Sequence, residues 1–341
     1  MTEMRPTPAS DSAVRFELAG PLARFDGRLA LPLIAAPMFL VSGPALVGAA
    51  CRAGVIGSFP TANCRTVEQL EQWLAGMRTE LDAFEQANGR RAAPIAPNLI
   101  VHKSNPRVAD DLRAVIAAGA ELVIASVGSP KDIIAPLHDA GCLVLADVAS
   151  MRHAEKAIEA GADGLILLTA GAGGQTGWAN PFAFARAVRA IWDGPMVMAG
   201  GISDGQALHA ARVLGCDLAY MGTPFIATEE SMAAEGYKRM LVESRIDDVL
   251  LTKAFTGLET NMLRPSISAA GLDPDNLPAR GGIDISKDIN PAERDKPGTK
   301  RWKDIWSAGH SVSGVDAVRP VAEFVQRVRE QYRSALASGR G

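Results

Sequence analysis

At 341 residues, the chain is longer than one hydrophobic core usually supports, unless it forms a large α/β barrel with an addition. Its apolar content of 48% suffices for a globular core, and its net charge of −3 excludes the strongly basic surface of nucleic-acid-binding proteins. Four scattered cysteines (Cys51, Cys64, Cys142 and Cys216) indicate a reduced, cytoplasmic protein. No apolar stretch reaches the length of a membrane span, and residues 1–15 are expected to form a flexible tail without a signal peptide.

Short apolar segments recur along the chain, and most precede a segment of helical length. Eight of them are predicted strands: 33–37, 55–58, 94–99, 121–126, 142–147, 163–168, 195–200 and 217–222. They are continuously apolar rather than alternating, which is typical of parallel strands buried on both faces. Glycines precede several of them, as in AGVIG, AGAELVI and AGADGLI, where each would end a helix in the left-handed conformation.

Eight strands that alternate with helices predict a TIM (β/α)₈ barrel over residues 16–225. The alternative is an open doubly wound sheet, which the strand count and the lack of Gly-x-Gly-x-x-Gly after the first strand disfavour. Residues 226–309 read as helices and Pro/Gly/Asp-rich loops, and we expect them to form a helical, partly irregular cap domain. Its part 271–300 is expected to be the most protease-sensitive internal region. Residues 310–341 are expected to return to the barrel and pack on it as its final helix.

Glycine-rich loops follow the last three predicted strands, at the end of the barrel where ligands bind. Their sequences are LLTAGAGGQTGW, AGGISDG and MGTPF. The backbone N–H groups near Gly200, Gly201 and Gly222, with the hydroxyl of Thr223, could hold a phosphate. Each glycine pair alone would equally indicate a sharp turn. Two such loops at adjacent strands favour a bound anion.

Polar side chains at other strand ends are candidate catalytic groups. His102 lies just past the third predicted strand, where it either faces the substrate or belongs to a solvated turn. Asp147 ends the fifth strand and either binds a ligand or caps the next helix. His310, in WSAGHS, could belong to the site or to the packing around it. No cluster has the spacing of a metal site, and no nucleophile elbow is present.

Taken together, these motifs resemble the nitronate monooxygenase family, formerly called 2-nitropropane dioxygenases, which is akin to the flavin-dependent enoyl-acyl-carrier-protein reductases. The motifs are APM, PNL, GAGGQTG, AGGISDG and YMGTPFIATEES, and the similarity returns in IWSAGHSVSGV. The resemblance implies an FMN-binding barrel with a helical second domain. The residues that it places around the flavin ring are Pro37, Met38 and Asn98, and those around the phosphate are Gly173, Gly200, Gly201, Met221, Gly222 and Thr223. The predicted cofactor site is completed by Ala36, Ser126, Asp147, Gly174 and Gln175.

In the loop 167–178 the sequence departs from the usual pattern of the family. Family members usually carry a glutamine and a glutamate ahead of an Ala-Gly-Gly-His whose histidine is the base or a donor close to the flavin. Here Leu168, Gly171 and Gln175 stand at those positions. An amide cannot take up a proton at neutral pH. Gln175 is therefore expected to orient the substrate or the flavin, and His102 is the first candidate for proton transfer.

We therefore expect an FMN-dependent oxidoreductase that oxidises a small nitronate-like or carbanion-like substrate with oxygen. A nitronate is already deprotonated, so the loss of the histidine need not abolish this chemistry. One alternative is an FMN-dependent reductase or dehydrogenase of an unsaturated or hydroxy acyl thioester, such as an acyl-CoA, with a nicotinamide as co-substrate. Another is a flavin-binding protein without turnover. Neither nucleic acid nor a membrane is an expected partner, and a homodimer is compatible with the sequence.

Overall fold

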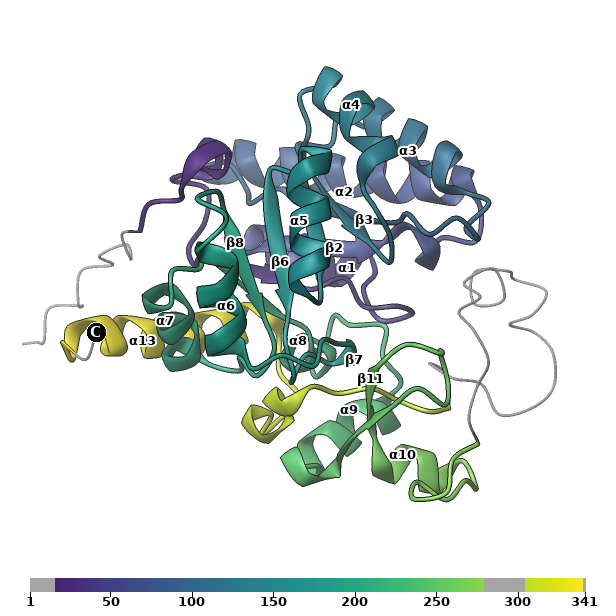
Figure 1. Ribbon diagram of the computed structural model, residues 1–341. Helices are drawn as coiled ribbons and strands as arrows, with labels where there is room; N and C mark the ends of the chain where they lie inside the picture. The colour runs from purple at the N-terminus through teal and green to yellow at the C-terminus, as the bar shows by residue number, and fades with distance from the viewer. Residues whose placement is uncertain (1–15, 279–303, 340–341) are drawn as a thin grey trace, which may run out of the picture.

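The computed structural model describes residues 16–278 and 304–339, and these contain a closed barrel of eight parallel strands (Figure 1). The strands are β1 (Leu33–Ala35), β2 (Ile56–Pro60), β3 (Ile95–Ile100), β4 (Leu122–Ser126), β5 (Leu143–Val148), β6 (Gly164–Leu168), β8 (Met196–Ala199) and β9 (Leu218–Met221). The first strand pairs with both β2 and β9, which closes the sheet. The predicted eight strands and the TIM barrel are confirmed.

The barrel strands are apolar on both faces because two hydrophobic layers meet them. Side chains such as Leu145 and Ile166 fill the barrel interior, which Phe25 of the 3₁₀ turn η1 (Gly20–Phe25) closes at the amino-terminal end. Neighbours of opposite parity, such as Val144 and Leu165, pack against the surrounding helices. Those helices are α1 (Pro44–Arg52), α2 (Val67–Asn88), α3 (Val108–Ala117), α4 (Lys131–Asp139), α5 (Met151–Ala160), α6 (Pro181–Arg189) and α7 (Gly205–Val213).

The last helix, α13 (Val321–Ala337), packs against α7 and α1 and so occupies the remaining position of the helical ring (Figure 1). The close approach requires glycine at position 205, because a Cβ there would lie 2.1 Å from the backbone nitrogen of Tyr332. A final helix was predicted for this segment, and one is present. Among the described residues, no helix is both long and apolar enough to cross a membrane.

The segment between the barrel and α13 contains strands as well as helices, so the prediction of helices and loops alone is wrong. A three-stranded antiparallel sheet joins β10 (Val249–Thr252), β11 (Thr260–Leu263) and β7 (Gly174–Gln175). The third of these strands belongs to the glycine-rich loop after β6. The strands β10 and β11 were not predicted because each has only four residues and β7, which pairs with β11, lies far away in the sequence. The pairing of β11 with β7 joins the cap to the barrel loop through backbone hydrogen bonds.

Short helices complete the cap, which lies beyond the carboxyl ends of the barrel strands (Figure 1). They are α8 (Thr223–Ile226), α9 (Glu235–Glu243), α10 (Arg264–Ala269) and the 3₁₀ turns η3 (Ile246–Asp248) and η4 (His310–Gly314). Most of the region expected to be protease-sensitive, and the expected flexible tail 1–15, lie outside the described residues. The residue at which barrel and cap divide stays a prediction.

Candidate active site

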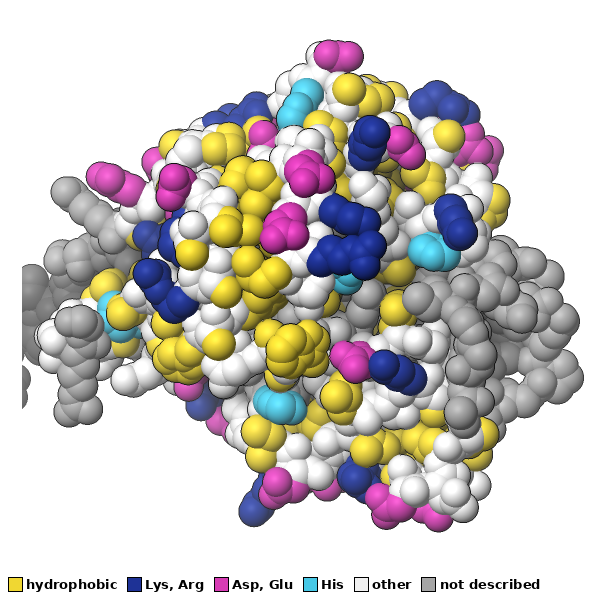
Figure 2. Space-filling view, viewed as in Figure 1, with side chains coloured by type: hydrophobic (Ala, Val, Ile, Leu, Met, Phe, Trp, Pro, Cys, Tyr) yellow, Lys and Arg dark blue, Asp and Glu magenta, His cyan; other side chains and the backbone are white. Residues whose placement is uncertain are grey.

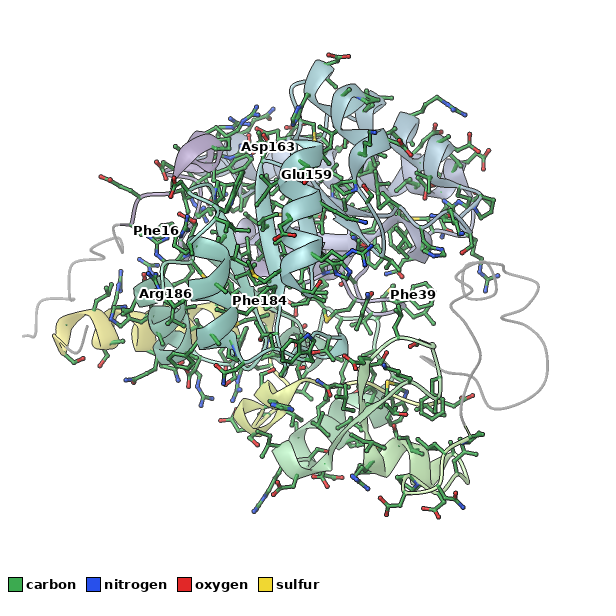
Figure 3. All side chains as sticks on the ribbon, viewed as in Figure 1. Phe16, Phe39, Glu159, Asp163, Phe184 and Arg186 are labelled. Carbon is green, nitrogen blue, oxygen red and sulfur yellow. The ribbon has the colours of Figure 1, made fainter. Side chains whose placement is uncertain are left out.

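A pocket of about 250 Å³ lies between the carboxyl ends of the barrel strands and the cap. Phe39, one of its lining residues, lies at the junction of the two parts (Figure 3). The lining includes every residue predicted for the cofactor site except Met221. Sequence segments that are far apart in the chain thus meet at one place.

The floor of this pocket is the last inward-facing layer of the barrel. Each floor residue comes two positions after a side chain of the interior core, because side chains alternate between the two faces of a strand. The floor residues are Ala36, Asn98, Ser126, Asp147, Leu168, Ala199 and Tyr220. Met221 has the opposite parity, and its side chain is buried in the layer between barrel and helices. The prediction that Met221 lines the cofactor site is therefore wrong for its side chain. Its carbonyl oxygen accepts the N–H of the lining residue Ala36 at 2.8 Å.

One end of the pocket is built from the backbone of the loops after β8 and β9. Gly200 and Gly201 have φ angles of 126° and 73°, which favour glycine. A Cβ on Gly200 would lie 2.4 Å from Oγ1 of Thr169, whereas one on Gly201 would have open space around it. Among the described residues, the N–H groups of Gly200, Gly201 and Gly222 have no hydrogen-bond acceptor. Free amides beside open space can bind an anion.

The glycine cluster of the loop after β6 allows another segment of the chain to approach this loop closely. Gly309 lies against this loop, and a Cβ on Gly173 would be 2.6 Å from the backbone nitrogen of Gly309. That nitrogen donates to Oγ1 of Thr223 at 2.9 Å. Asn261 of β11 donates to the carbonyl of Ala172 at 2.8 Å. The loop that carries Gln175 is therefore fixed by the cap and by the segment before η4.

Gln175 lies in the pocket lining, at the edge where barrel and cap meet. As part of β7 it pairs with Thr260 of β11. The next residue, Thr176, donates its hydroxyl to the carbonyl of Thr169 at 2.7 Å. The backbone on both sides of this lining residue is thus held in place.

Neither candidate histidine lies in the pocket lining. The Nδ1 atom of His102 is 2.8 Å from Oγ of Ser104, so its ring belongs to the turn that follows β3. His310 begins η4, and its backbone N–H donates to the carbonyl of Gly171 at 2.9 Å. His102 therefore lies outside the described lining, and its role in proton exchange stays a prediction.

Asp147 is the one carboxyl group in the lining that the structure describes. Its Oδ1 atom is buried and has no hydrogen-bond partner among the described residues. Burial raises the pKa of this carboxyl from 3.8 to about 7. The next helix, α5, is capped instead by Ser150, which accepts the N–H of His153 at 3.2 Å. The structure therefore favours a ligand-binding role for Asp147 over capping of the next helix.

Several lining residues were not predicted from the sequence. Tyr220 could have been found, because it lies on the inward face of β9 two residues after Leu218. Burial and the nearby charge of Asp147 raise the pKa of its phenol well above 10. The lining residues from the cap have no such pattern: Tyr237, Thr256, Leu258, Thr260, Trp306 and Ser307.

Acidic and basic side chains are interspersed on the face seen in Figure 2, without a large patch of one sign.

Comparison with known proteins agrees with these features. Residues 28–330 match the nitronate monooxygenase family. A nitronate monooxygenase of Paraburkholderia phytofirmans is 28% identical, over 89% of this chain and 93% of that protein. A (3aS,4S,5R,7aS)-5-hydroxy-7a-methyl-1-oxo-octahydro-1H-indene-4-carboxyl-CoA dehydrogenase of Rhodococcus jostii is also 28% identical, but the match spans 69% of this chain and 63% of that protein.

Two solved structures share the fold. FabK of Thermotoga maritima has a TM-score of 0.75 at 24% identity and covers 93% of this chain and 98% of its own. A nitroalkane oxidase of Streptomyces ansochromogenes has a TM-score of 0.72 at 24% identity, with 92% and 99% covered. The barrel, the pocket at its carboxyl end and the family match over most of the chain lead to one conclusion: this chain is an oxidoreductase of the nitronate monooxygenase family.

Proposed function

We propose that the pocket binds FMN and that the protein oxidises a small nitronate-like or carbanion-like substrate with oxygen. The observation that carries the proposal is the backbone cradle after β8 and β9, where the N–H groups of Gly200, Gly201 and Gly222 are free among the described residues. A phosphate group at this place would accept hydrogen bonds from amides that otherwise have no acceptor. This donor set suits a phosphomonoester such as that of FMN.

The rest of the pocket suits a flat, mostly apolar group. Pro37, Met38 and Leu168 provide apolar surface, and Asn98 provides a polar contact. The amide of Asn98 donates to Oγ of Ser126 at 2.9 Å and to the carbonyl of Ile124 at 3.1 Å, so its position is fixed. FMN, when bound, supplies two-electron redox chemistry. The chain supplies orientation, polarity and exclusion of water.

Gln175 would orient the substrate. Its amide N–H can donate to an oxygen of a nitro or carbonyl group, where negative charge develops. The backbone on both sides is held by Thr260 and Thr176, which limits the movement of this donor. Apolar lining residues around the site, such as Leu258 and Ile226, would strengthen the interaction by excluding water.

A second candidate function is a dehydrogenase or reductase of an acyl thioester, with a nicotinamide as the redox partner. The match to the carboxyl-CoA dehydrogenase of Rhodococcus jostii favours it. The apolar cap side of the pocket, with Leu258 and Trp306, could hold an acyl chain. No Lys or Arg lies in the described lining, so the phosphates of a CoA would have to bind outside the pocket.

Cofactor release and anaerobic flavin spectra test both candidates. We expect a yellow protein that releases FMN rather than FAD on heating. Under anaerobic conditions a nitronate should bleach the flavin, and air should restore its colour. Bleaching by NADH or NADPH, with recovery on addition of an unsaturated acyl-CoA, would instead establish the second function. A colourless protein that also fails to bind added FMN would refute the cofactor proposal.

A further inference from the structure

The pocket has a very small set of ionisable groups. Within the described lining these are Asp147, Tyr220 and Tyr237, with no Lys, Arg, His, Glu or Cys. Burial raises the pKa of Tyr237 to about 12, and that of Tyr220 is also raised well above 10. Both phenols stay protonated near neutral pH. Within the described lining, Asp147 is therefore the ionisable side chain that can accept a proton from a bound molecule near neutral pH.

The surroundings of Asp147 leave its carboxylate without compensation. Its register partner on β6 is the apolar Ile166, and the uncharged Ser126 of β4 and the apolar Leu168 of β6 line the pocket with it. Tyr220 of β9, also on the pocket floor, is the titratable group close enough to sense its charge. The residue is half-buried, but its Oδ1 atom is buried and has no partner among the described residues, and such a carboxylate has a high affinity for a proton. The burial that raises its pKa thus also makes it a base suited to neutral pH.

We propose that Asp147 is the base that removes a proton from a neutral carbon acid, such as a nitroalkane, in this pocket. The C–H bond breaks, its electron pair stays on the substrate and spreads onto the two nitro oxygens, and the proton forms an O–H bond on Asp147. The products are a nitronate and a neutral carboxylic acid. The inference rests on the proposed function, because it supplies the nitronate that is then oxidised.

Charge balance makes this step suitable for a pocket without cations. The negative charge moves from Asp147 to the substrate, so the total charge of the pocket stays the same. A nitronate that enters from solvent would instead place a second negative charge beside the carboxylate. Because like charges in an apolar site repel strongly, a preformed nitronate should bind together with a proton. Its affinity should fall by about tenfold for each pH unit above the pKa of Asp147.

Hydrogen–deuterium exchange at the α-carbon of nitroethane tests the inference directly. It is followed by NMR in D₂O, under anaerobic conditions, with the purified protein. The variant Asp147→Asn keeps the shape of the side chain but cannot accept a proton. We expect it to lower protein-catalysed exchange by about 10² to 10⁴-fold, the usual contribution of a general base. Asp139→Asn, at the exposed end of α4, makes the same change outside the pocket and should leave exchange unchanged.

Oxidation of preformed ethyl nitronate separates proton transfer from the later step. With both rates expressed per bound FMN, Asp147→Asn should raise the ratio of nitronate oxidation to nitroethane oxidation by about 10² to 10⁴-fold, since the nitronate needs no C–H bond broken. Equal loss with nitroethane and with the nitronate would overturn the role of Asp147 as a base. If the unmodified protein exchanges nitroethane but oxidises neither compound, the proposed function fails while the inference stands.

The unmodified protein provides a test that does not depend on a folded variant. Its exchange rate should rise with pH as the carboxylate forms, with a midpoint at about pH 7, and should level off above that pH. An infrared carboxylic-acid band should disappear over the same range and be missing in Asp147→Asn. A pH-independent exchange rate between pH 5.5 and 8.5, or no exchange above that of the buffer, would refute the inference.

Discussion

Replacing Asp147 by asparagine should stabilise the protein, and by an amount that grows with pH. Burial raises the pKa of this carboxyl from 3.8 to about 7 in the folded state, whereas in the unfolded chain it titrates near its ordinary value. A raised pKa means that the folded state holds a proton that the unfolded state has lost. The carboxyl therefore costs no stability below pH 3.8, and the cost is complete above pH 7.

The magnitude follows from the pKa difference. At about 1.4 kcal/mol per pH unit, the cost is roughly 1.5 kcal/mol at pH 5 and at most roughly 4 kcal/mol at pH 8. An asparagine does not ionise, so it avoids this cost at both values. It has nearly the same volume, so the interior packing of Leu145, and of Ile166 that pairs with position 147, should stay unchanged. The gain in stability from Asp147→Asn should therefore be larger at pH 8 by about 2 to 3 kcal/mol.

Urea denaturation at pH 5 and pH 8 measures this difference. Both proteins are compared as purified, with equal cofactor content, because a bound ligand shifts apparent stability. Asp139→Asn on the surface of α4 serves as the control and should show no such pH dependence. If Asp147→Asn changes the free energy of unfolding by the same amount at both pH values, Asp147 titrates normally in the folded protein, and its assignment as a base near neutral pH is lost.

Further substitutions at three positions test the pocket and the last helix. Gly201→Asp should abolish FMN binding, because its charge would enter the proposed phosphate site, whereas the neutral Gly201→Asn should retain more of it in a flavin fluorescence titration. Gln175→Ala should lower turnover by about 10 to 1000-fold with FMN still bound; unchanged turnover would make the amide a turn residue only. Gln175→His should add a pH-dependent step to the rate profile. Gly205→Val should lower the melting temperature by several degrees, because its side chain would collide with the backbone of α13; an unchanged melting temperature would contradict that packing.

Sequence patterns alone were sufficient for the barrel and for most of its floor. Continuous apolar runs predicted the strands because a parallel strand in a barrel is buried on both faces. The alternation of side chains along each strand also determines which residues reach the pocket. Asn98 and Asp147 are inward-facing by this rule, and Met221 is not. Applying the rule at the sequence level would have added Tyr220 and removed Met221 from the predicted site.

Tertiary structure alone decided which distant segments meet, because a short segment gains its conformation from its partners. The pairing of Gln175 with Thr260 depends on a cap strand too short to be recognised by itself. The same is true of Gly309 against the glycine cluster, an approach that no local pattern indicates. The protonation of Asp147 also belongs here. From its residue type alone, its pKa would be that of an ordinary carboxyl. The assembled barrel and cap bury it without a hydrogen-bond partner for Oδ1, and this burial raises its pKa towards neutrality.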